Sequence, residues 1–142
     1  MKTTTLRRRL AGTAVTALVA GAGILATAPS AAAKANQITI DSVSLSGQAV
    51  QVRLTYSCDP GLGQQLVASA TALDSHSTNP GSAAAIVTSD KLVCDYANHK
   101  AVVTLHNAHD THFARKDTVK IAVFTFDKDG DKTADGTAVA VL

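Results

Sequence analysis

The sequence predicts an all-β fold, an Ig-like antiparallel β-sandwich of seven or eight strands with one disulfide. From residue 37 onward, apolar and polar residues alternate with a period of two, and no segment keeps the 3.6-residue period of a capped helix. All eleven acidic residues are Asp, which favours turns, and none is Glu, which favours helices. These observations indicate strands joined by tight loops. A small β-barrel is the main alternative architecture.

Residues 1–33 are predicted to be a signal peptide that is removed on export. The basic start MKTTTLRRRL precedes the apolar stretch AGTAVTALVAGAGILATA, and Ala31 and Ala33 occupy the small-residue positions of a cleavage site before Lys34. A permanent membrane anchor is the alternative, but Gly and Thr make this stretch only weakly apolar. We therefore expect a single secreted, extracellular domain, residues 34–142, with no membrane span after cleavage.

Cleavage would change the net charge of the protein. Four of the thirteen Lys and Arg residues lie in the predicted signal peptide, so nine would remain against eleven aspartates, and the net charge would change from +2 to −2. A nucleic acid or an anionic membrane surface attracts basic proteins. We therefore expect no nucleic-acid partner.

The two cysteines of the chain, Cys58 and Cys94, are expected to form a disulfide, because an exported protein meets an oxidising compartment. The bond would close a loop of 36 residues and stabilise the fold by about 3–4 kcal/mol, because it restricts the conformations of the unfolded chain. It would run either across two sheets or between neighbouring strands. A metal-thiolate site is the alternative, but the usual paired cysteine spacings are absent.

The strands are predicted in chain order from the alternation. The clearest is 48–58, QAVQVRLTYSC, in which Val50, Val52 and Leu54 face one side. Pro60 and the glycines around it end this strand, and a long polar connection, 107–117, lies later in the chain. The predicted strands are 38–47, 48–58, 64–74, 83–89, 91–96, 100–106, 118–126 and 136–142.

The stretches VRLTYSCDPG, VCDYANHKAVV and FTFDKDGD, together with the Ala-rich signal, carry a resemblance to a known group of proteins. The chain resembles the small secreted actinobacterial proteins of unknown function that contain an Ig-like β-sandwich domain. The resemblance implies export and the sandwich fold. It implies no activity, because these families have none established.

The stretch DKDGDKTADG, 127–136, suggests a calcium site. Asp127, Asp129 and Asp131 match positions 1, 3 and 5 of a calcium loop, and Asp135 matches position 9. The match fails where position 6 lacks Gly and position 12 lacks Glu, so a helical-hand site is excluded. Two interpretations stay open. One is a hairpin loop with a weak structural calcium site, and the other is a solvated turn favoured by Asp-Gly.

A second candidate metal site lies in LHNAHDTHF, where His106, His109 and His112 are spaced by three residues. Imidazole is a common ligand of zinc, copper and nickel. This spacing fits one face of a short helical turn and would splay in an extended loop. The alternative is an exposed polar loop from which Phe113 enters the core.

The sequence offers little for catalysis. It contains no G-x-S-x-G elbow, phosphate-binding glycine loop or zinc-protease motif. Asp95 and His99 near Cys94 imitate a thiol-nucleophile set, but a disulfide would silence that thiol. We therefore expect a secreted non-enzymatic β-sandwich that binds an unknown protein or a cell-envelope component, with calcium as the one candidate cofactor. The alternatives are a secreted transition-metal-binding protein that uses the histidine loop, and a small secreted enzyme inhibitor.

Overall fold

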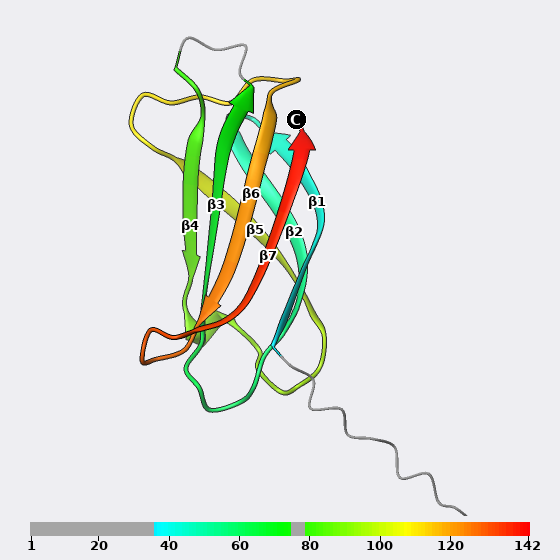
Figure 1. Ribbon diagram of the computed structural model, residues 1–142, viewed down its shortest axis with the longest axis vertical. Helices are drawn as coiled ribbons and strands as arrows, with labels where there is room; N and C mark the ends of the chain where they lie inside the picture. The colour runs from blue at the N-terminus through cyan, green and yellow to red at the C-terminus, as the bar shows by residue number, and fades with distance from the viewer. Residues whose placement is uncertain (1–35, 75–78) are drawn as a thin grey trace, which may run out of the picture. The chain divides into compact units, whose positions relative to one another are not determined.

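The computed structural model describes residues 36–74 and 79–142, so the predicted signal peptide, 1–33, lies outside the described residues. Within these ranges the chain forms strands joined by loops and one turn of 3₁₀-helix, η1 (Figure 1). No helix in this part of the chain has the length and apolar character needed to cross a membrane. The elements are β1 (Gln37–Ser46), β2 (Ala49–Ser57), β3 (Gln65–Asp74), β4 (Ser82–Val87), η1 (Ser89–Lys91), β5 (His99–Asn107), β6 (Thr118–Phe126) and β7 (Lys132–Val141).

The seven strands form one antiparallel sheet in the order β1-β2-β5-β4-β3-β6-β7. The sheet folds over into two layers, with β4, β3, β6 and β7 in front of β5, β2 and β1 in Figure 1. The layers are joined where Ala83 and Ala84 of β4 pair with Asn107 and His106 of β5. The prediction of an all-β fold of seven antiparallel strands with one disulfide is confirmed.

The strand order can be compared with that of the immunoglobulin domain. When the strands are lettered A to G along the chain, the order becomes A-B-E-D-C-F-G, which contains the A-B-E-D and C-F-G runs of a constant-type domain. Here β4 pairs with β3 along its whole length and with β5 at only two positions. The fourth strand therefore belongs mainly to the layer of β3, β6 and β7.

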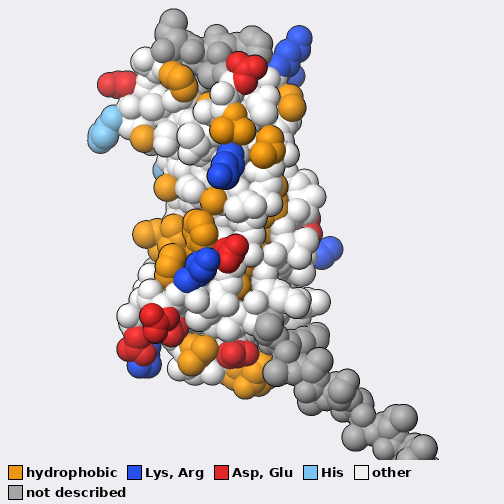
Figure 2. Space-filling view, viewed as in Figure 1, with side chains coloured by type: hydrophobic (Ala, Val, Ile, Leu, Met, Phe, Trp, Pro, Cys, Tyr) orange, Lys and Arg blue, Asp and Glu red, His pale blue; other side chains and the backbone are white. Residues whose placement is uncertain are grey.

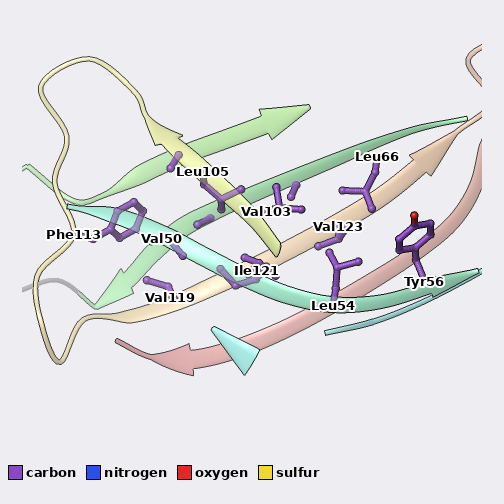
Figure 3. Close-up of a cluster of buried hydrophobic side chains, with 14 of the residues drawn as sticks. Val50, Leu54, Tyr56, Leu66, Val103, Leu105, Phe113, Val119, Ile121 and Val123 are labelled. Carbon is purple, nitrogen blue, oxygen red and sulfur yellow. The ribbon is translucent and has the colours of Figure 1, made fainter. Parts of the chain in front are cut away.

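The core lies between the two layers and is built from the inward residues of each strand (Figure 3). In β2 the predicted inward residues Val50, Val52 and Leu54 are fully buried, while the alternating residues between them are not. In β6, Val119, Ile121 and Val123 are buried in the same way. Several core positions hold only Ala. The small core residues are Ala68, Ala70 and Ala83.

The sheet is nearly closed, because its two outermost strands, β1 and β7, contact each other. Ile38 of β1 packs against Gly136 of β7. A Cβ at Gly136 would lie 3.1 Å from a side-chain carbon of Ile38 and 3.2 Å from its carbonyl oxygen. Glycine at this position therefore lets the backbones of the two strands approach.

One predicted strand is wrong. Residues 91–96, KLVCDY, do not form a strand, since residues 89–91 form η1 and residues 92–98 are an irregular connection. The connection takes the chain from β4 in one layer to β5 in the other. Its apolar residues are explained by the contacts of this crossing with the end of the core, where Leu92 and Cys94 are partly buried.

A second glycine has a steric role beside Phe113, which the sequence correctly places in the core. A Cβ at Gly81 would lie 2.4 Å from the Phe113 ring, closer than real Cβ contacts. We expect Gly81→Ala to lower the free energy of unfolding by about 1–3 kcal/mol, because the buried ring must shift. Urea unfolding of Gly81→Ala, Phe113→Ala and the double variant measures the effect. Strictly additive losses would contradict the steric explanation, because removal of the ring should abolish the clash.

Candidate functional site: a pinned loop between the layers

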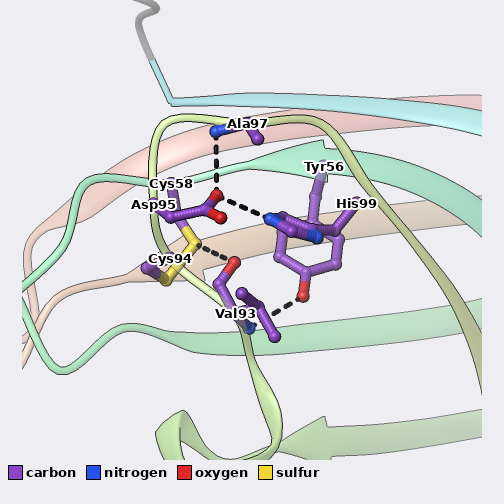
Figure 4. Close-up of polar contacts among 7 residues, drawn as sticks. All are labelled: Tyr56, Cys58, Val93, Cys94, Asp95, Ala97 and His99. Atoms are coloured by element: carbon purple, nitrogen blue, oxygen red, sulfur yellow. Dashed lines mark hydrogen bonds and ion pairs between the residues drawn. A yellow bond between two sulfur atoms is a disulfide. The ribbon is translucent and has the colours of Figure 1, made fainter.

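The connection of residues 92–98 is held to the end of β2 by side chains that β2 directs inward (Figure 4). The alternation of β2 places Tyr56 on the core side, and Cys58 follows directly after the strand. Both side chains are buried, at 4% and 1% exposure. The end of β2 therefore offers two fixed attachment points to the crossing chain.

The first attachment is the disulfide between Cys58 and Cys94, which confirms the predicted pair. The second is a hydrogen bond from the backbone N–H of Val93 to the hydroxyl oxygen of Tyr56, at 3.1 Å. The carbonyl oxygen of Val93 also lies 3.5 Å from Sγ of Cys58. This contact is no hydrogen bond, because a disulfide sulfur carries no proton.

Asp95 fixes the second half of the connection. Its Oδ1 accepts a hydrogen bond from the backbone N–H of Ala97 at 2.9 Å and lies 2.6 Å from Nε2 of His99. The His99 ring packs in turn against Tyr56, with ring centroids 5.8 Å apart. The hydrogen bond with His99, and next that from Ala97, hold the pKa of the Asp95 carboxyl below its usual value.

Tyr96 lies between these attachments in a strained backbone conformation. Its φ is +65°, in the left-handed region, where a residue with a side chain is disfavoured by about 1–2 kcal/mol. Its backbone N–H donates a hydrogen bond to the carbonyl oxygen of Cys58 at 3.2 Å. The Tyr96 side chain is nevertheless 54% exposed, and that of Val93 is 53% exposed. The loop therefore presents an aromatic and an aliphatic side chain to solvent on a fixed backbone.

Three of the four aspartate carboxylates of the last hairpin make separate contacts. Oδ1 of Asp127 accepts hydrogen bonds from the backbone N–H groups of Asp129 and Asp131, at 3.0 and 2.9 Å. The carboxylates of Asp129 and Asp135 each pair with a lysine side chain, at 3.0 and 2.9 Å. The structure thus favours the hairpin-turn interpretation, and calcium binding stays a prediction.

The three histidines are also distributed over different elements. His106 is exposed on β5, and His109 and His112 are exposed in the connection to β6. Among residues 36–74 and 79–142, no three His, Cys, Asp or Glu side chains gather into a group that could hold a metal ion. The use of this segment as a transition-metal site therefore stays a prediction without support from side-chain placement.

The pinned loop contains no free thiol. Both cysteines of the chain are in the disulfide, so the thiol nucleophile that Asp95 and His99 would serve is absent. A scan of the chain against protein-family models gives no match, and a search of curated proteins finds no similar sequence.

Sequence reasoning did not identify Tyr96. The sequence feature that could have identified it is the tetrapeptide Cys-Asp-Tyr-Ala. The Asp side chain accepts a hydrogen bond from the backbone N–H two residues later, which closes a turn around the Tyr between them. The apolar neighbours of this tetrapeptide favoured a strand instead. The loop conformation depends on Cys58 and Tyr56, which lie more than thirty residues earlier in the chain.

We expect Asp127→Ala to lower the free energy of unfolding by about 1–2 kcal/mol, because two backbone N–H groups lose their acceptor. We also expect millimolar calcium to leave the melting temperature of the unsubstituted protein unchanged. Asp129→Ala is the control, since its carboxylate contacts only a lysine side chain and should contribute less than about 0.5 kcal/mol. A calcium-dependent rise in melting temperature that Asp127→Ala abolishes would restore the calcium site.

Asp95 should make the free energy of unfolding depend on pH in the acidic range. A carboxyl whose folded pKa lies below its usual 3.8 stabilises the fold fully above that value, and the contribution is lost as pH falls through the lowered pKa. We expect Asp95→Asn to be less stable than the unsubstituted protein near neutral pH, with a difference that shrinks below about pH 4. Urea unfolding across this range measures it. In a His99→Ala background the difference should be smaller, and an unchanged difference would contradict the assigned cause.

Proposed function

We propose that this protein is a secreted, non-enzymatic domain of Ig-like character that binds another protein through the loop of residues 92–98. The observation that carries the proposal is Tyr96, a half-exposed aromatic residue held at a φ of +65° within a disulfide-pinned loop. Strained conformations persist where the surroundings impose them, and they concentrate at binding and catalytic sites.

A rigid loop lowers the conformational-entropy cost of binding, because its surface is already ordered. Tyrosine anchors protein interfaces because it combines a large apolar ring with a hydroxyl and has few torsions to fix. The exposed Val93 adds apolar surface in the same loop. The Asp95–His99 pair supplies polar groups of the kind found at interface rims.

Secretion is supported by the disulfide, which suits an oxidising compartment, and by the signal-like pattern of residues 1–33. The composition favours a protein partner over a sugar of the cell envelope. Sugar sites use platforms of exposed aromatic residues, whereas Tyr96 is the single exposed aromatic residue of the described part of the chain; Tyr56 and Phe113 are buried, and Phe124 and Phe126 are partly buried. If the partner is an enzyme, the protein would inhibit it through the same rigid loop.

The test uses Tyr96→Gly. Glycine adopts a positive φ without strain, so we expect the free energy of unfolding to stay unchanged or to rise by up to about 1 kcal/mol. Binding to the partner should be lost, because the aromatic anchor is gone. The purified proteins are immobilised and exposed to secreted and envelope proteins of the source organism, and the retained proteins are identified.

Val102→Ser is the matched control, since Val102 is equally exposed, at 54%, but lies on β5 outside the loop. We expect one protein to be retained by the unsubstituted chain and by Val102→Ser, and not by Tyr96→Gly. Equal retention by Tyr96→Gly would remove the loop from consideration as the binding surface.

A further inference from the structure

The strand β5 has one edge that is open along most of its length. Its other edge pairs with β2 at seven positions, from His99 to Leu105, without a register shift. On the open edge β4 pairs with β5 only at His106 and Asn107, since β4 pairs along its whole length with β3 in the other layer. Figure 1 shows β5 running away from β4 at an angle. Among the described residues, no strand therefore pairs with 100–105 on this edge.

The backbone groups that face the open edge belong to Lys100, Val102 and Thr104. Successive residues of a strand direct their N–H and C=O groups to opposite edges. The N–H of Ala108 donates to the carbonyl oxygen of Ser82, on the β4 side, at 2.8 Å. The even-numbered residues of β5 therefore point to the open edge, and the odd-numbered residues point to β2. Outside the strand ladders, no backbone hydrogen bond of the described residues reaches these three residues.

The side chains along the edge alternate between solvent and the inside of the sandwich. Those of the three even-numbered residues are exposed on the outer face. The inward side chains on either side of the opening are only partly buried. They are Ala101 of β5 and Ala85 and Val87 of β4. An added strand would thus find backbone partners along the edge and apolar side chains beneath it.

We propose that this open edge of β5 binds an extended segment of another protein, which adds as an antiparallel strand and carries acidic side chains on its outward face. The unpaired N–H and C=O groups of an edge strand favour such an addition. In a constant-type immunoglobulin domain, the fourth strand pairs with this edge of the fifth. The added strand would continue the line of β4, from Thr104 toward Lys100. This contact is separate from the loop of residues 92–98, and it uses backbone groups that Val102→Ser keeps.

Two cations lie beside the open edge. Lys100 is on β5, and Arg53 is on β2 beside Val102. Both side chains are exposed, and neither has an ion-pair partner among the described residues. The carboxylate of Asp41, on β1, accepts a hydrogen bond from Thr55 at 2.8 Å. The edge therefore presents positive charge to the strand that pairs with it.

This charge favours an acidic segment over a second copy of the chain. β5 contains no acidic residue, so a second β5 would bring only its own lysine and histidines to the seam. Lysine on an edge strand opposes pairing between like chains. A Glu opposite Lys100 forms a favourable cross-strand pair. The outer face of β4, β3, β6 and β7 makes no such distinction, because Figure 2 shows charged side chains of both signs among its apolar ones.

Hydrogen exchange followed by NMR tests whether the edge is open. In the free protein, the amide protons of Lys100, Val102 and Thr104 should exchange faster than those of Ala101 and Val103, which face β2. Protection of the three edge amides that is lost on dilution would show a second copy on the edge. Protection that persists on dilution would show that the chain covers its own edge. Either result would overturn the proposal.

The probe for binding is the peptide acetyl-Glu-Val-Glu-Val-Glu-amide, whose alternation places Glu on the outer face and Val beneath. We expect it to slow exchange at the three edge amides. It should bind about five-fold or more tightly than acetyl-Lys-Val-Lys-Val-Lys-amide, because the cross-strand charge pairs change sign. N-methylation of its Glu residues should abolish binding, since their N–H groups face β5. N-methylation of its Val residues is the matched control, because those N–H groups face away.

A charge reversal in the protein completes the test. Lys100→Glu should reverse the preference, so that the lysine peptide binds more tightly than the glutamate peptide. Lys120→Glu is the matched control, since Lys120 is an exposed lysine on β6 in the other layer, and it should leave the preference unchanged. A melting curve of each variant checks that it folds. No slowing of exchange by about 1 mM glutamate peptide, equal binding of the two peptides, or tolerance of Glu N-methylation would each overturn the proposal.

Discussion

The Cys58–Cys94 bond joins the end of β2 to the connection that must cross from one layer to the other. Without it, residues 92–98 would be attached mainly by hydrogen bonds to Tyr56 and to the carbonyl oxygen of Cys58. On the chain-entropy account, a bond spanning 36 residues stabilises the fold by about 4 kcal/mol. This is a large share of the stability of a domain this small. The same bond also holds the strained conformation of Tyr96, so fold stability and the proposed binding surface depend on one constraint.

The core explains why this constraint matters. Ala68, Ala70 and Ala83 occupy buried positions where larger side chains would bury more apolar surface, so hydrophobic stabilisation per residue is modest. Gly136 lets the backbones of β1 and β7 approach each other beside Ile38. The core therefore buries less apolar surface than larger side chains would, and the disulfide offsets part of the lost stabilisation.

Alternation was sufficient to predict the inward face of β2, because this strand buries one side and a shift of one residue in register would expose all of its apolar side chains. The disulfide was predicted from the presence of two cysteines and from the oxidising compartment expected for an exported protein. The segment KLVCDY was predicted wrongly because Leu92 and Cys94 are partly buried against the end of a distant strand, which no local period indicates. The aspartates of 127–135 were matched to a calcium loop by spacing alone, whereas the hairpin directs Asp127 to its own backbone. Strand order depends on pairings between strands far apart in the chain, so the sequence could not supply it.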